Sequence, residues 1–433
     1  MKLKLKTIEN LILLLIIGQV VVFRYFNVYE IVNKIILTLI ILLLFLNLII
    51  EKKLEFKVRG NLTSIIILIV LLIVNGLIYG INQTFKSNVL MIFYPLMNMS
   101  FFVWYVMRYQ DYFYGRMVQL RYVVNIYFII NIVVMLIQLQ GNYFMVGVVT
   151  QENTLYHDLV SGLFGYSMTA SVCYFSTFVI IYNIVIAKAM KVRIKKILFN
   201  IYNFFLVLIM AYLSTQNDNV QYFAIVMLAL IFILLSNNRL NTITGMQKVI
   251  FVVLLSVFGI IILLFTVPGL FEILNERVLY KFIGAIEHMY DGASVTHGSM
   301  ERIALVVYGL TNADGWVLGR GLSYAGVYTP YTFGFVHFGN ANIGAFICLG
   351  GIWFYFSIIY LYSTRLIAMV EYNICKKKKI FYRLVIPIFL IVVSLFSLPF
   401  TDVSIGLCVF FIILTFGLNE YLDSNIKEIK SAK

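Results

Sequence analysis

Long apolar runs separated by short polar connections are the dominant pattern along this chain. The runs are 17 to 22 residues long, and stretches such as 31–50 are apolar on every face. Helices of this length cross a hydrocarbon core of roughly 30 Å, whereas strands of an outer-membrane barrel alternate apolar and polar residues over about ten residues. The pattern therefore predicts membrane-spanning helices and excludes both a water-soluble globule and an outer-membrane barrel.

We predict twelve spans, and hence an all-α, polytopic membrane protein. Two pairs of spans, within 197–235 and 381–418, are almost continuous runs of 39 and 38 residues. As single helices they would be about 57–58 Å long, nearly two membrane thicknesses, so each must be a hairpin. The turns are expected at 214–219 and 398–402, where short polar residues and Pro399 end helices. The predicted spans are 7–23, 31–50, 62–81, 88–107, 122–140, 166–187, 197–213, 219–235, 249–267, 341–362, 381–398 and 401–418.

The composition agrees with this class of protein. Of 433 residues, 62% are hydrophobic and 12% charged, about half the charged fraction of an ordinary soluble domain. No GxxxxGK phosphate loop is found, which disfavours an ATP-driven pump. Cysteines lie in three spans and one predicted cytoplasmic connection, so they offer neither a disulfide framework nor a metal site. They are Cys173, Cys348, Cys408 and Cys375.

The charge of +14 indicates orientation more than a partner. With the amino terminus inside, inner segments hold 26 Lys and Arg with 8 acids, and outer segments hold 7 with 11 acids. The faces then carry +18 and −4, so we expect both termini in the cytoplasm, a cytoplasmic-membrane location and affinity for anionic inner-leaflet lipid, with no nucleic acid as partner. No cleavage site follows the first span, which is expected to be retained.

One outer connection is much longer than the others. It holds about 73 residues and divides the chain into 1–267 with spans one to nine, 268–340 as an extracellular cap loop, and 341–433 with spans ten to twelve and a cytoplasmic tail. Long loops of this kind are usually lids or binding elements. Apolar residues at spacings of three and four predict short helices at 270–290 and 299–311.

The end of this loop carries the candidate chemistry. Gly319 and Gly321 flank Arg320, so the backbone can adopt unusual angles and approach a ligand while the guanidinium offers a planar fork to phosphate oxygens. Arg302 lies upstream in the same segment. An outer arginine is equally well explained as a headgroup anchor or acid partner, and it is the two glycines that favour function for Arg320.

His337, Asn340 and Asn342 form a polar set at the entrance to span ten. Buried polar groups are costly unless satisfied, so this set fits a functional site as well as a packed, hydrogen-bonded one. The aromatic residues around it could form a membrane-interface belt or platforms for sugar rings. The four histidines are separated by 131, 9 and 40 residues, which match no metal pattern, and we predict neither a metal nor a cofactor.

These features together resemble the superfamily of O-antigen ligases and Wzy-type polysaccharide polymerases. The resemblance covers the whole architecture, while its motifs are confined to about Glu301 to Asn342. It implies an integral-membrane glycosyltransferase of the type C class, which moves a glycan from an undecaprenyl-diphosphate carrier to an acceptor hydroxyl without a nucleotide sugar or essential metal. By position, Arg302 and Arg320 would hold the diphosphate and His337 would lie at the reacting centre.

The chain departs from the family at the turn between spans seven and eight. Many relatives have an arginine after a serine there, whereas this turn reads STQNDNVQ, so Asn217 or Asp218 could have a different role. The acceptor hydroxyl needs a base or an orienting group, and three candidates stay open. They are His337, Glu301 and Asp314.

We expect a polymerase of lipid-linked oligosaccharide repeat units, acting at the outer membrane face, possibly with other assembly proteins as partners. An O-antigen-type ligase uses the same donor and is the nearest alternative. A flippase or transporter would more usually show two similar halves and charges within the spans, where Lys34 is the only clear one here. A receptor or scaffold also stays open. The Ile-, Asn-, Lys- and Tyr-rich composition suggests a capsule or exopolysaccharide pathway in a Gram-positive cell.

Overall fold

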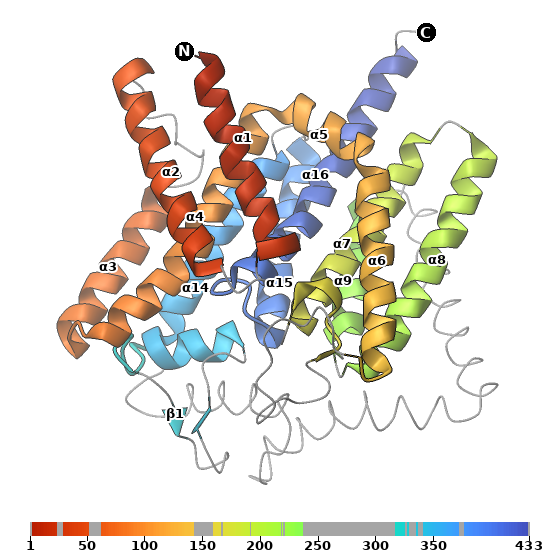
Figure 1. Ribbon diagram of the computed structural model, residues 1–433. Helices are drawn as coiled ribbons and strands as arrows, with labels where there is room; N and C mark the ends of the chain where they lie inside the picture. Colours follow the sequence, from red (N-terminus) through yellow and green to blue (C-terminus); the bar gives the residue numbers. More distant parts are fainter. Residues whose placement is uncertain are drawn as a thin grey trace.

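The computed structural model is a bundle of long helices (Figure 1). It describes residues 2–23, 29–51, 62–142, 159–165, 168–190, 192–217, 219, 221–236, 317–324, 327–328, 335–336, 341–371 and 376–431. The predicted span at 249–267 and the predicted helices at 270–290 and 299–311 lie outside these residues, as does most of the cap loop.

Helices account for nearly all of the elements. The first half of the chain contains α1 (Lys2–Gly18), the π-helical η1 (Gln19–Phe23), α2 (Tyr29–Glu51), α3 (Leu62–Tyr79), α4 (Gln83–Arg108), α5 (Gln110–Gln119), α6 (Arg121–Leu139), the 3-10 turn η4 (Gly162–Phe164), α7 (Thr169–Ala189), α8 (Arg193–Gln216) and α9 (Gln221–Ser236). The rest contains β1 (Val327–Tyr328), β2 (Phe335–Val336), α14 (Asn342–Glu371), α15 (Lys376–Phe396) and α16 (Val403–Ser431). The two short strands pair antiparallel.

The helices are those of a polytopic membrane protein. Among the described residues, seven are long and apolar enough to cross a membrane: α4, α6, α7, α8, α14, α15 and α16. Shorter apolar helices occupy Ile31–Leu46, Thr63–Tyr79 and Gln221–Ser236. Eleven of the twelve predicted spans coincide with a helix, and the twelfth lies outside the described residues.

Both predicted hairpins are confirmed as breaks between helices. α8 ends at Gln216 and α9 begins at Gln221, while α15 ends at Phe396 and α16 begins at Val403. In the second turn the Asp402 carboxylate accepts hydrogen bonds from the amides of Ser404 and Ile405, at 2.9 and 3.1 Å. This cap satisfies two of the donors that every helix start leaves without an intrahelical partner.

The centre of the bundle is formed by α7 and α16, which pack on each other. Their apolar windows are 89% and 94% buried, against 28% for α8. On α8, Ile194, Leu198 and Phe204 are among the exposed apolar side chains. Lipid chains accept such a surface without cost, so α8 lies at the periphery because of its exposed apolar face.

Buried charges are more numerous than expected. Lys34 was predicted to be the only clear charge within a span, but Glu9, Arg365 and Glu420 are buried in α1, α14 and α16. The prediction was wrong because α14 and α16 continue beyond the predicted span ends at 362 and 418, and because Glu9 has partners on α4. The extensions carry paired polar groups into the bundle.

α14 contains a sharp kink at Gly351. Its φ of 79° and ψ of 176° are incompatible with a helix. Figure 1 shows the part before the kink lying across the lower end of the bundle and the part after it running upward. α1 begins and α16 ends at the upper end, so the kink lies near the end opposite to them.

We predict that Gly351→Ala lowers stability. The left-handed backbone disfavours an L-residue by about 1–2 kcal/mol, and the new Cβ would also collide with the carbonyl oxygen of Val317. Gly115→Ala is the control, because this glycine is helical and its Cβ would meet nothing within 4 Å. Thermal unfolding of the purified protein in detergent should show a loss for Gly351→Ala and no loss for Gly115→Ala. Equal melting temperatures for all three proteins would contradict the kink.

Candidate functional site

The segment 317–324 is the described part of the chain that holds sequence-predicted site residues next to each other. It lies at the lower end of the bundle in Figure 1, beside the turn between α3 and α4. Gly319 has a φ of 73° and Gly321 a φ of 93°. Both glycines thus adopt the left-handed conformation that L-residues rarely take, with Arg320 between them.

The backbone around Arg320 binds the kink in α14. The Arg320 amide donates to the carbonyl of Cys348 at 2.7 Å, and the Gly321 amide donates to that of Leu349 at 2.9 Å. In an unbroken helix these carbonyls would accept from residues four positions later, but the break at Gly351 removes that pairing. The 317–324 segment therefore satisfies carbonyls that the kink leaves without helical partners.

Close packing makes glycine necessary at both positions. A Cβ at Gly319 would lie 2.5 Å from the backbone nitrogen of Gly350, and a Cβ at Gly321 would collide with the ring of Tyr79. Backbone cannot move aside as a flexible side chain can, so any larger residue at Gly319 would push the segment away from α14. The two glycines fix the direction in which Arg320 leaves the backbone.

Polar side chains of the α3–α4 hairpin hold the other side of the segment. Asn75 accepts from the Leu322 amide at 2.8 Å and donates to the Leu349 carbonyl at 3.4 Å. The Tyr79 hydroxyl donates to the Gly319 carbonyl at 2.5 Å. Asn88 donates to the Leu322 carbonyl at 2.7 Å and Asn82 donates to the Ser323 carbonyl at 3.1 Å. Two helices separated by more than 230 residues from this segment thus determine its position.

The Arg320 side chain is half-buried, and its Cζ lies 5.8 Å from the centroid of the Tyr324 ring. A guanidinium over an aromatic face is attracted by the ring quadrupole, which orients it without consuming all of its five donors. Charge and a fork of donors, held on a rigid backbone, suit an anion with two or more oxygens, such as a phosphate or diphosphate.

Asn342 has a structural role in the turn between α15 and α16. It is fully buried, its Oδ1 accepts from the Phe400 amide at 2.8 Å and its Nδ2 donates to the Thr401 hydroxyl at 2.9 Å. The Asn342 amide donates to the carbonyl of Ser397 at 3.0 Å. Of the two alternatives for this residue, the packed and hydrogen-bonded one accounts for its side chain.

Several predicted site residues lie outside the described residues, together with all four histidines. They are Glu301, Arg302, Asp314, His337, Asn340 and Asp218. The neighbours of Asp218 are described: Asn217 donates to the Val160 carbonyl at 3.2 Å and Asn219 donates to the Thr169 carbonyl. These bonds anchor the α8–α9 turn to the segment before α7 and to the start of α7.

Asn75, Tyr79 and Asn88 are site-forming residues that sequence reasoning missed. Their signal was present, since Asn75 and Asn88 are amides within predicted spans, where a polar side chain is expensive unless bonded. Asn82 is different, because it precedes α4 and also caps it by accepting from Phe85 at 2.8 Å. No sequence pattern distinguishes a cap that also binds a distant loop.

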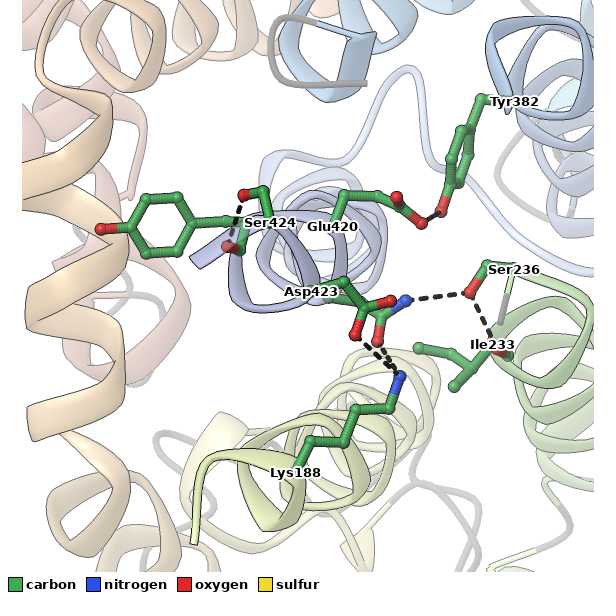
Figure 2. Close-up of polar contacts among 9 residues, drawn as sticks. Lys188, Ile233, Ser236, Tyr382, Glu420, Asp423 and Ser424 are labelled. Atoms are coloured by element: carbon green, nitrogen blue, oxygen red, sulfur yellow. Dashed lines mark hydrogen bonds and ion pairs between the residues drawn. The ribbon is translucent and has the colours of Figure 1, made fainter. Parts of the chain in front are cut away.

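A second polar cluster converges on α16 (Figure 2). Lys188 lies 3.9 Å from the carboxylate of Asp423 and donates to Asn419, which in turn donates to Ser236 at 3.0 Å. On another side, Tyr382 donates to Glu420 at 2.9 Å. Each of these contacts joins α16 to α7, α9 or α15, so the cluster holds the helices together.

We predict that Asn342→Ala destabilises the protein by about 1–3 kcal/mol, because it leaves the buried Phe400 amide and Thr401 hydroxyl without partners. Ser357→Ala on the same helix is the control, since that hydroxyl bonds only within its own helix at an exposed position. Thermal unfolding in detergent should separate the two variants. A melting temperature of Asn342→Ala equal to that of the control would show that the amide does not hold the turn.

No known protein family and no characterised protein matches this chain in sequence. A function therefore has to be argued from the residues themselves.

Proposed function

We propose that the protein is an integral-membrane glycosyltransferase that polymerises lipid-linked oligosaccharide repeat units of a capsule, exopolysaccharide or O-antigen. It would transfer the glycan from an undecaprenyl-diphosphate carrier to an acceptor sugar hydroxyl at the outer face of the cytoplasmic membrane. The observation that carries this proposal is the placement of Arg320, on a rigid glycine-flanked turn at one end of a bundle of apolar helices.

The chemistry of a lipid diphosphate fits this placement. Glycosyl transfer develops negative charge on the departing phosphate oxygen, and a preorganised guanidinium stabilises such charge strongly where water is excluded. The donor lipid is held in the membrane by its polyprenyl chain, so its diphosphate must lie at the ends of the helices. The half-buried Arg320 is at such an end.

The remaining roles follow the family resemblance. Arg302 would bind the diphosphate together with Arg320, with Gly319 and Gly321 allowing close approach. His337 would lie at the reacting centre, and His337, Glu301 and Asp314 are the candidates for activating or orienting the acceptor hydroxyl. No step requires a metal or cofactor.

The proposed topology has twelve spans, with residues 268–340 as an extracellular cap and both termini in the cytoplasm. Two features of the fold support it. α1 begins and α16 ends at the same end of the bundle, and the 317–324 segment lies at the opposite end (Figure 1). With the basic connections inside, the site would face outward.

Cysteine accessibility tests this orientation. In a background with Cys375→Ser, we expect Lys57→Cys and Lys377→Cys to resist a membrane-impermeant maleimide on intact cells. Lys86→Cys is the positive control, because this residue is exposed at the start of α4, near the 317–324 segment. Labelling at residues 57 or 377 from outside would overturn the topology.

The proposed reaction is tested with Arg320→Lys. An ammonium keeps the charge but cannot reproduce a bidentate fork, so we expect at least tenfold slower elongation of a purified lipid-linked repeat unit at unchanged abundance of folded protein. Arg193→Lys, at an exposed position on α8, should retain full activity. Near-normal elongation by Arg320→Lys would remove Arg320 from the site, and wild-type protein that carries the lipid-linked unit across vesicles without elongating it would contradict the polymerase.

A further inference from the structure

The short helix α5 lies across the upper end of the bundle, where α1 begins and α16 ends (Figure 1). Tyr114 and Met117 are buried on its inner side. Tyr112 and Arg116 face outward and are exposed. α5 is therefore a shelf, with an apolar side on the core and a polar, aromatic side that faces away from it.

Cations gather on the aromatic rings of this shelf. Lys6 Nζ lies 5.2 Å and Arg116 Cζ 5.3 Å from the centroid of the Tyr112 ring. The two charges are thus at most 10.5 Å apart on one exposed ring. Just beyond α5, Arg121 Cζ lies 4.6 Å from the centroid of the Tyr122 ring, and its Nη2 donates to the Tyr122 hydroxyl at 2.8 Å.

The acids nearby do not balance these cations. Glu9 is buried, accepts from the Tyr109 hydroxyl at 2.6 Å and lies 3.5 Å from Arg108. Burial, with this hydrogen bond to Glu9, raises the pKa of Tyr109 to about 12, so Tyr109 stays a neutral donor and adds no negative charge. The exposed Asp111 is the one acid in α5 itself, against the three cations Lys6, Arg116 and Arg121.

We propose that Lys6, Tyr112, Arg116, Arg121 and Tyr122, here called the α5 patch, bind the headgroup phosphate of an anionic phospholipid. A phosphate near the Tyr112 ring would lie close to two like charges that otherwise repel each other. Amphipathic aromatic and basic side chains are the groups that occupy the headgroup level of a membrane. Binding at this patch does not depend on the proposed glycosyl transfer.

The position of the patch favours a lipid over a free anion. α6 begins at Arg121, and directly after Tyr122 its exposed side chains become apolar, with Val123 61% and Ile126 57% exposed. A headgroup phosphate on Arg121 would place the acyl chains of the same lipid along this apolar face of α6. A free phosphate would gain nothing from that face.

The test uses the full-length protein in a non-ionic detergent and measures lipid binding by native mass spectrometry. We expect phosphatidylglycerol to bind about tenfold or more tightly than phosphatidylcholine with the same acyl chains. Each basic group near an anionic headgroup contributes about a fivefold change in affinity. The double variant Arg116→Gln, Arg121→Gln should therefore lose ten- to thirtyfold in affinity for phosphatidylglycerol.

The matched control is Arg193→Gln, Lys195→Gln, which removes two exposed charges from the start of α8. We expect it to change the affinity less than twofold. Tyr112→Phe should retain binding and Tyr112→Leu should weaken it, because the ring holds both Lys6 and Arg116. Asp111→Asn should tighten binding severalfold by removing the acid from the patch, which keeps the test valid even if the double arginine variant folds poorly.

Three results would overturn the proposal. One is equal affinity for phosphatidylglycerol and phosphatidylcholine. Another is an equal loss in the α5 and α8 double variants, which would indicate general attraction by the basic end of the protein. The third is complete displacement of the lipid by millimolar inorganic phosphate, which would make the patch a site for free anions.

Discussion

The structure at the lower end of the bundle depends on the carbonyls of Cys348 and Leu349. The kink at Gly351 removes their helical partners in a part of the protein where no bulk water replaces them. Each unpaired carbonyl there would cost several kcal/mol. The amides of Arg320 and Gly321 pair with both, so the kink and the loop each require the other. A substitution in either element acts on both.

This mutual dependence is also how the protein places a charged side chain without a rigid domain around it. The Arg320 backbone is bonded to α14 on one side, while Asn75 and Tyr79 of α3 bond its neighbours Leu322 and Gly319 on the other. Only the guanidinium is left to reach beyond the turn. Preorganisation of this kind is what electrostatic stabilisation of a transition state requires, because little reorganisation is needed when charge develops.

Amide side chains hold the bundle together elsewhere as well. Gln19 donates to Asn33 at 2.6 Å, and Asn98 donates to both, joining η1, α2 and α4. Lipid chains are as apolar as leucine, so helices in a membrane gain little from apolar burial against each other and rely on packing and interhelical hydrogen bonds. The charged groups are concentrated at the upper end, where Lys188 and Asp423 pair and where the α5 patch lies.

The class of the protein could be predicted from sequence because hydrophobic length alone determines whether a helix can span a membrane. Both hairpin breaks were predictable for the same reason, since a run of 38 or 39 apolar residues cannot be one span. The need for glycine at Gly319 and Gly321 was also visible, because glycines that flank a functional side chain indicate unusual backbone angles.

Only the tertiary structure assigned the remaining roles. Gly351 is one glycine among apolar residues, a common feature of membrane helices, and nothing local marks it as a kink. Asn342 was a candidate for the site and instead holds the α15–α16 turn, while Tyr79 was not a candidate and binds the Arg320 turn from 240 residues away. A polar residue in an apolar run shows by itself that a partner must exist. The partner's identity depends on which helices pack side by side, and periodicity along one chain segment contains no record of that.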